Sequence, residues 1–179
     1  MKRWLRRNLA ALIVIVVSIP VLAFVLVGIP LQGRSGGPEI VTVPQGDSFE
    51  AGGYTFTLTT SQEFPGGGTG DDSGANGIPL GSSLVGAIIT AEPTGETTDT
   101  TCETTLTSRA GGPERSWATV SSPTDFDYGV GDDRTTSCLL DGDPFELETV
   151  FLTPSGVYDR ATIDLSVGGE TFRLALQHE

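Results

Sequence analysis

The sequence predicts an all-β domain, a sandwich of two sheets, preceded by one transmembrane α-helix. Beyond residue 38, short runs rich in Thr, Val, Phe and Ile alternate with Gly, Pro and Asp, and no stretch has a helical period. Before it, Leu9 to Leu31 forms a run of 23 residues without a charge. We therefore expect a cytoplasmic N-terminus (1–8), a membrane helix (9–31), a linker (32–38) and an extracytoplasmic β-sandwich (39–179).

The segment Leu9–Leu31 is long enough to cross a bilayer. A helix of this length extends ~34 Å, and the hydrocarbon core is roughly 30 Å thick. The charged residues before it are all basic: Lys2, Arg3, Arg6 and Arg7. Because positive charge stays in the cytoplasm, we predict a single-pass protein of the plasma membrane with its C-terminal domain outside.

A cleavable signal peptide is the alternative interpretation of the same segment. Leu9–Ile19 could be its apolar region, and Val21-Leu22-Ala23 loosely fits the small-residue rule for cleavage. Cleavage there would leave the apolar sequence Phe24–Val27 at the new terminus, and the uninterrupted run exceeds the roughly 7–15 residues typical of a signal peptide. These features favour an uncleaved signal-anchor.

The charge balance limits the function of the exported part. Residues 34–179 contain six basic and 23 acidic residues, a formal charge of −17, and the whole chain has one His. A nucleic-acid partner is excluded, because a strongly acidic domain repels a polyanion. With one His, the chain cannot form a metal site that needs several His ligands. The sequence indicates no cofactor.

Eight segments have the pattern of strands, and several of them alternate apolar and polar residues. In Gly53–Thr60, Tyr54, Phe56 and Leu58 share one face, whereas Leu84–Ala91 is nearly all apolar, as in a central strand covered on both sides. The last hairpin turns at Gly168-Gly169 through a two-residue turn of the primed type. The apolar residues of its first strand are Ile163, Leu165 and Val167, and those of its second strand are Phe172, Leu174 and Leu176. The first strand of this hairpin is Ala161–Val167, and the other four segments are Ile40–Val43, Cys102–Arg109, Arg115–Ser121 and Phe145–Leu152.

The connections contain two segments poor in core residues and one pair of cysteines. Pro65–Gly77 and Pro93–Thr101 are expected to be surface loops, because they bury too little apolar area to offset the entropy of ordering them. Cys102 and Cys138 are predicted to form a disulfide, since the domain is exported and has no other Cys. A redox pair is the less favoured alternative, because no Cys-x-x-Cys is present.

Acidic residues cluster on the expected loops and make weak candidates for a calcium site. Calcium needs six to eight oxygen ligands from flexible loops, but none of these clusters continues into an EF-hand loop. A solvated acidic surface is the alternative. The candidates are Asp125, Asp127, Asp132, Asp133, Asp141 and Asp143.

Several short motifs carry a resemblance to a known group of proteins. They include the Arg-rich start with one apolar span, Cys102, the Arg115–Trp117 triplet, Ser137-Cys138, and the segment from Pro144 to Pro154 before the last hairpin. In that order they resemble single-pass membrane proteins of high-GC Gram-positive bacteria with an immunoglobulin-like extracytoplasmic domain of unknown function. The end of the chain is also similar to a small immunoglobulin-like family of secreted antigens and lipoproteins. The resemblance implies an immunoglobulin-like sandwich outside the cell and brings no catalytic residue.

The expected function is that of a membrane-anchored binding or interaction module at the cell envelope, not of an enzyme. Partners would be the membrane, through Leu9–Leu31, and an envelope protein. The loops at Asp125–Asp133 and Asp141–Asp143 are where a cationic partner is expected. An accessory subunit of a larger membrane complex is the first alternative and a hydrolase using two carboxylates is the second.

Overall fold

The computed structural model describes Ser18 and residues 40–67, 77–95, 100–109 and 112–176. The predicted membrane segment 9–31, apart from Ser18, lies outside these residues, as do 68–76 and 96–99 of the two expected loops. Among the described residues, no helix has the length and apolar character needed to cross a membrane. The unit described below is Ile40–Glu179.

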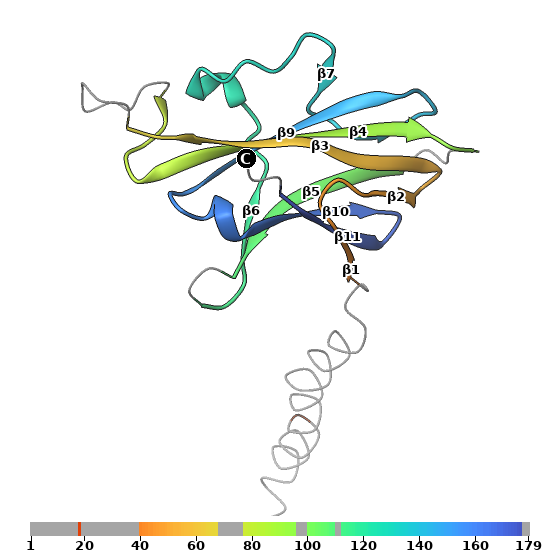
Figure 1. The fold of residues 1–179 in the computed structure, drawn as a ribbon, viewed down its shortest axis with the longest axis horizontal. Coiled ribbons are helices and arrows are strands. Elements are labelled where there is room, and N and C mark those ends of the chain that lie inside the picture. The colour runs from red at the N-terminus through yellow and green to blue at the C-terminus, as the bar shows by residue number, and fades with distance from the viewer. Residues whose placement is uncertain (1–17, 19–39, 68–76, 96–99, 110–111, 177–179) are drawn as a thin grey trace, which may run out of the picture. The chain divides into compact units, whose positions relative to one another are not determined.

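The described strands form two sheets that pack face to face (Figure 1). Sheet A has the order β1 (Ile40–Val43), β11 (Glu170–Ala175), β10 (Ala161–Val167), β5 (Thr100–Ser108) and β6 (Arg115–Ala118), and β8 (Leu139–Leu140) also pairs with β5. Sheet B has the order β2 (Ser48–Ala51), β3 (Tyr54–Pro65), β4 (Ser82–Pro93), β9 (Phe145–Pro154) and β7 (Arg134–Thr135). The pairs β1–β11 and β7–β9 are parallel and the other pairs are antiparallel. The prediction of an all-β, two-sheet sandwich is confirmed.

The core fills the space between the sheets and follows the predicted alternation. Tyr54 and Phe56 on β3 are fully buried and Leu58 nearly so. On β10, Ile163 lies opposite Leu174 of β11 and Leu165 lies opposite Phe172. Gly168 and Gly169 have positive φ angles of 60° and 90°, as a primed turn requires, so the last hairpin is confirmed.

Strand β4 lies in the middle of sheet B and is covered on both faces, as its apolar sequence predicts. Val85, Ala87 and Ile89 belong to the core between the sheets. Leu84, on the opposite face, is also buried, in a second and smaller apolar cluster. Sheet B is therefore packed on both sides over part of its area.

The chain crosses from sheet A to the far side of sheet B after β6. This strand ends at Ala118, three residues before the expected end, because Thr119 forms an isolated bridge with Phe151 of β9 and the Val120 amide donates to the Val150 carbonyl at 2.8 Å. The short 3₁₀ helix η3 (Pro123–Phe126) and β7 follow. Figure 1 shows η3 on the side of sheet B that faces away from sheet A, and β7 joins the edge of sheet B next to β9. The segment Thr119–Cys138, hereafter the excursion, pairs with β9 through Thr119 near its start and through β7 near its end. It therefore protects the edge of sheet B.

A disulfide between Cys102 and Cys138 closes the excursion, which confirms the predicted pairing. Cys102 lies on β5, and Cys138 directly precedes β8, the short strand that returns the chain to β5. Both residues are buried, and their Cα atoms are 5.2 Å apart. The bond therefore fixes the point at which the chain returns to sheet A.

Replacing both cysteines should destabilise the domain. The closed loop spans a sequence separation of 36 residues, for which the chain-entropy relation gives about 4 kcal/mol. We expect the Cys102→Ser/Cys138→Ser variant of a 34–179 fragment to melt roughly 10 °C below the parent, by circular dichroism. A reductant should lower the melting temperature of the parent and leave that of the variant unchanged. If the reductant did not change the melting temperature of the parent, the prediction would be contradicted.

Candidate functional site

The outer face of sheet B carries an apolar cluster beneath the excursion. Ile78, Leu84 and Val150 are buried there, although they lie outside the core between the sheets. Ile78 precedes β4, and the other two residues lie on the neighbouring strands β4 and β9. Partly buried side chains pack around them: Phe64, Val120, Phe126, Tyr128 and Leu152.

A β-bulge in β3 sets which side chains reach this face. The register with β4 shifts between Leu58, which pairs with Ile89, and Thr60, which pairs with Ile88, so Thr59 is the extra residue. Because successive residues point to opposite faces, one extra residue reverses the alternation beyond it. Gln62 and Phe64 therefore share the outer face with their partners Gly86 and Leu84.

Gly86 allows an aromatic ring to lie directly on the sheet. A Cβ at this position would lie 2.7 Å from the Tyr128 hydroxyl oxygen, so any other residue would force the Tyr128 side chain to move. The Tyr128 ring also meets Phe64 edge to face, with 5.4 Å between centroids. The glycine thus accounts for the close approach of Tyr128 to β4.

Below Tyr128 lies Glu148 of β9, whose side chain is only 2% exposed. One carboxylate oxygen accepts the Tyr128 hydroxyl at 2.7 Å, and the other accepts the Gly131 amide at 3.0 Å and Arg134 Nη1 at 3.3 Å. Arg134 Nε also donates to Glu146, at 3.0 Å. Since a buried carboxylate is costly unless it is hydrogen-bonded, these three donors explain how Glu148 is accommodated.

The same contacts set the ionisation of the donors. Burial, followed by the hydrogen bond to Glu148, raises the pKa of Tyr128 well above its usual value. The hydrogen bond to Glu146 raises the pKa of Arg134, and Glu148 adds to this effect. At neutral pH, Tyr128 is therefore a neutral donor and Arg134 a cation held between two carboxylates.

These residues bound a cleft of about 370 Å³, hereafter the outer cleft. Its apolar walls come from Phe64, Ile78, Leu84, Ile88, Phe126 and Tyr128, and its polar groups include Thr60, Gln62, Asp127, Arg134 and Glu148. Asp127, which follows η3 with a φ of 53°, is exposed. Ligand sites commonly combine apolar walls with polar groups that orient the ligand, and this cleft contains both.

The structure brings together few of the acidic residues proposed as calcium ligands. Of these, Asp127 lines the outer cleft, and Asp143 donates its amide to the Asp141 side chain at 3.2 Å in the turn before β9. All six candidates are exposed: Asp125, Asp127, Asp132, Asp133, Asp141 and Asp143. Within the described parts of the chain, no three Asp, Glu, His or Cys side chains form a group that could hold a metal ion. The geometry gives the calcium hypothesis no support.

Of the residues that build the outer cleft, the sequence singled out only Asp127, within the Asp125–Asp133 loop where a cationic partner is expected. A signal for part of it is present in β9, where one face reads Glu146, Glu148, Val150 and Leu152. The change from charged to apolar residues along that face indicates that part of the outer surface is covered. Nothing in the sequence indicates that Tyr128 and Arg134 supply the donors to Glu148.

Comparison with known proteins gives only distant structural likenesses. No protein-family model and no curated protein sequence matches the chain. A β-sandwich protein of uncharacterised function from Clostridium difficile 630 is similar in structure, with 11% identity, a TM-score of 0.43, and coverage of 80% of this chain and 99% of that one. A candidate lipoprotein from Bacillus subtilis, YcdA, is similar with 10% identity and a TM-score of 0.40, over 72% of this chain and 38% of that one.

Replacing Glu148 should destabilise the domain more than replacing Glu146. In Glu148→Gln an amide group faces three donors in a buried place, and we expect a loss of roughly 2–3 kcal/mol in the free energy of unfolding. Glu146→Gln is the matched control, since its half-exposed side chain meets the same arginine and should lose less than about 1 kcal/mol. Urea unfolding of both variants measures the difference. Equal losses would contradict a specific role for Glu148.

The raised pKa of Tyr128 predicts a loss of stability in alkali. Above pH 10, the ordinary pKa of a tyrosine, the phenol ionises in the unfolded chain while it stays protonated in the folded one. The stabilisation from Tyr128 is thus fully present below pH 10 and declines as the pH rises further. We expect the difference in unfolding free energy between the parent and Tyr128→Phe to shrink above pH 10 in urea titrations. A constant difference would contradict this assignment.

Proposed function

We propose that the chain is a single-pass membrane protein whose extracytoplasmic β-sandwich is a non-catalytic binding module at the cell envelope. Its ligand binds in the outer cleft and combines a cationic group with an apolar face. The observation that carries the proposal is the cleft itself, where the three aromatic side chains of Phe64, Phe126 and Tyr128 gather beside carboxylates.

The chemistry of the outer cleft favours a cation over an anion. Aromatic faces and carboxylates both attract cations, and a desolvated cation–π contact contributes about 1–2 kcal/mol. The positive charge of Arg134 is already matched by Glu146 and Glu148, and Asp127 adds a further negative charge. Glu148 accepts three hydrogen bonds, so its oxygens have little capacity left to act as an acid or base on a substrate.

The membrane anchor rests on the sequence. The 23 uncharged residues of Leu9–Leu31 and the four cations before them support a signal-anchor with the domain outside. The predicted disulfide, present in the structure, agrees with an oxidising location. The proposal also includes that the sandwich is immunoglobulin-like and that it meets a protein partner at the cell envelope.

The anchor is tested by fractionating cells that produce the full chain. We expect the protein to stay with the membranes in alkaline carbonate, with an intact N-terminus and a domain that external protease can reach. A mature protein beginning after Ala23 in the culture fluid would replace the anchor with a signal peptide.

The outer cleft is tested by nuclear magnetic resonance with benzyltrimethylammonium and, as the uncharged control, benzyl alcohol. We expect the cation to shift the amide signals of Gly86, Gly129 and Gly131, and the alcohol to shift them far less. Ile88→Arg, which fills the cleft with a like charge, should abolish the shifts. Ile40→Arg, at an exposed position on β1, should preserve them. Equal shifts with both compounds, or shifts that persist in Ile88→Arg, would refute this part of the proposal.

A further inference from the structure

Four of the five arginines of the domain are gathered at one place. The chain beyond residue 39 contains five basic residues, all Arg. Arg134 belongs to the outer cleft. The other four lie where the hairpin of β5 and β6 adjoins β10 and β11: Arg109, Arg115, Arg160 and Arg173. In a domain this acidic, such a concentration of positive charge requires an explanation.

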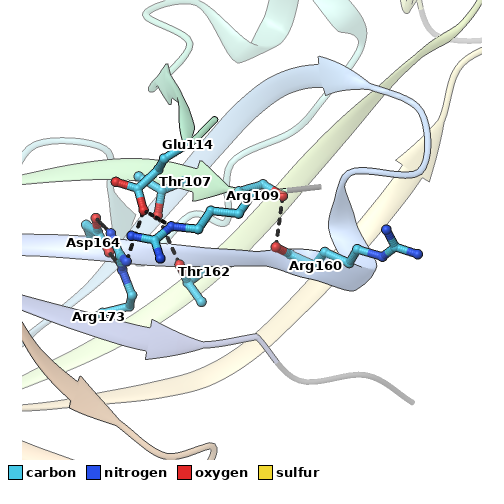
Figure 2. Close-up of polar contacts among 8 residues, drawn as sticks. Thr107, Arg109, Glu114, Arg160, Thr162, Asp164 and Arg173 are labelled. Carbon is cyan, nitrogen blue, oxygen red and sulfur yellow. Dashed lines mark hydrogen bonds and ion pairs between the residues drawn. The ribbon is translucent and has the colours of Figure 1, made fainter. Parts of the chain in front are cut away.

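Two of the four arginines are matched by carboxylates on the outer face of sheet A. Arg173 donates to both Asp164 oxygens, each at 2.7 Å, and to Glu114 at 3.2 Å, which also accepts from Arg109 at 2.9 Å. Figure 2 shows Arg109 and Arg173 converging on Glu114. Their charges are therefore largely satisfied within the protein.

Arg115 and Arg160 differ from this pair. Within the described parts of the chain, neither of them forms an ion pair, and both are exposed. Figure 2 shows the Arg160 guanidinium extending away from the Glu114 network. The Ser108 hydroxyl donates to the Arg160 carbonyl at 2.8 Å, and the Ser108 backbone pairs with that of Arg115 between β5 and β6. Ser108 therefore holds the backbone of both arginines.

These two arginines line one groove, hereafter the arginine groove, of about 350 Å³ between β6 and the connection from β9 to η4 (Tyr158–Arg160). Its apolar surface comes from Trp117, Pro154 and Val157, and within the part of the chain that the structure describes none of its lining residues is acidic. Trp117 is half-buried and packs against the main core, so its ring is held in place. The groove combines two cations with a fixed apolar floor.

We propose that the arginine groove binds a carboxylate that carries an apolar substituent, as at the C-terminus of a peptide with an apolar last residue. Arg115 and Arg160 hold the carboxylate, since a planar guanidinium matches its two oxygens. The apolar substituent packs on Trp117 and Val157. The net charge of −17 in residues 34–179 does not prevent this, because at physiological salt distant charges are screened beyond about 8 Å.

The test uses the full chain in a neutral detergent, with Trp4→Phe so that Trp117 is the only Trp. Its emission is followed on addition of acetyl-Ala-Phe, the same peptide as its amide, or inorganic phosphate. We expect a saturable change with the free acid, binding at least roughly tenfold weaker with the amide, and weaker binding at high salt. Phosphate, which has no apolar part, should compete poorly.

Variants that remove one positive charge test whether the peptide binds in the arginine groove. Arg115→Gln and Arg160→Gln should each weaken binding of the free acid by roughly tenfold. Arg109→Gln is the matched control, since it removes the same charge nearby but outside the groove and should leave binding unchanged. Ile88→Arg should also leave binding unchanged, which separates this proposal from that of the outer cleft. The absence of a saturable signal, equal binding of acid and amide, competition by phosphate at equal concentration, or an equal effect of Arg109→Gln would each overturn it.

Discussion

The buried carboxylate of Glu148 constrains the outer side of sheet B more than any other group. A carboxylate on β9 with 2% exposure must be supplied with donors, and all three come from one short segment, Tyr128–Arg134. This segment is rich in Gly and Asp, and within it the ring of Tyr128 packs against Phe64. Its position against the sheet therefore depends on Glu148 together with this aromatic contact, and so does the wall of the outer cleft that it forms.

Two further attachments hold the excursion of which that segment is part. At its start, Thr119 and Val120 pair with β9, and at its end Cys138 is bonded to Cys102 of β5. The disulfide thus joins the returning chain to the sheet that it left. The excursion gives sheet B a covered edge and a second apolar cluster, which a plain two-layer sandwich would lack.

Local patterns in the sequence predicted much of the sandwich but little of the outer cleft. The strands β1, β10 and β11, the turn at Gly168-Gly169 and the disulfide follow from alternation, turn chemistry and the presence of only two Cys. Strands as short as β7 and β8 give no periodic signal. The bulge at Thr59, which moves Phe64 to the outer face, has no distinctive residue, and the donors to Glu148 lie 14–20 positions away.

Net charge is a poor guide to the ligands of such a domain, because charge acts over short distances in salt. The acidic residues outnumber the basic ones in residues 34–179 by 17, which opposes an extended polyanion that must contact a large surface. A single anionic group meets only its immediate surroundings. Among the residues that the structure describes, Arg115 and Arg160 line a groove without an acid, so those surroundings are positive, whereas Arg134, which lines the outer cleft, is held by two carboxylates. One acidic domain can therefore present two surfaces of opposite preference, and the distribution of its five arginines, not their number, decides which ligand each surface accepts.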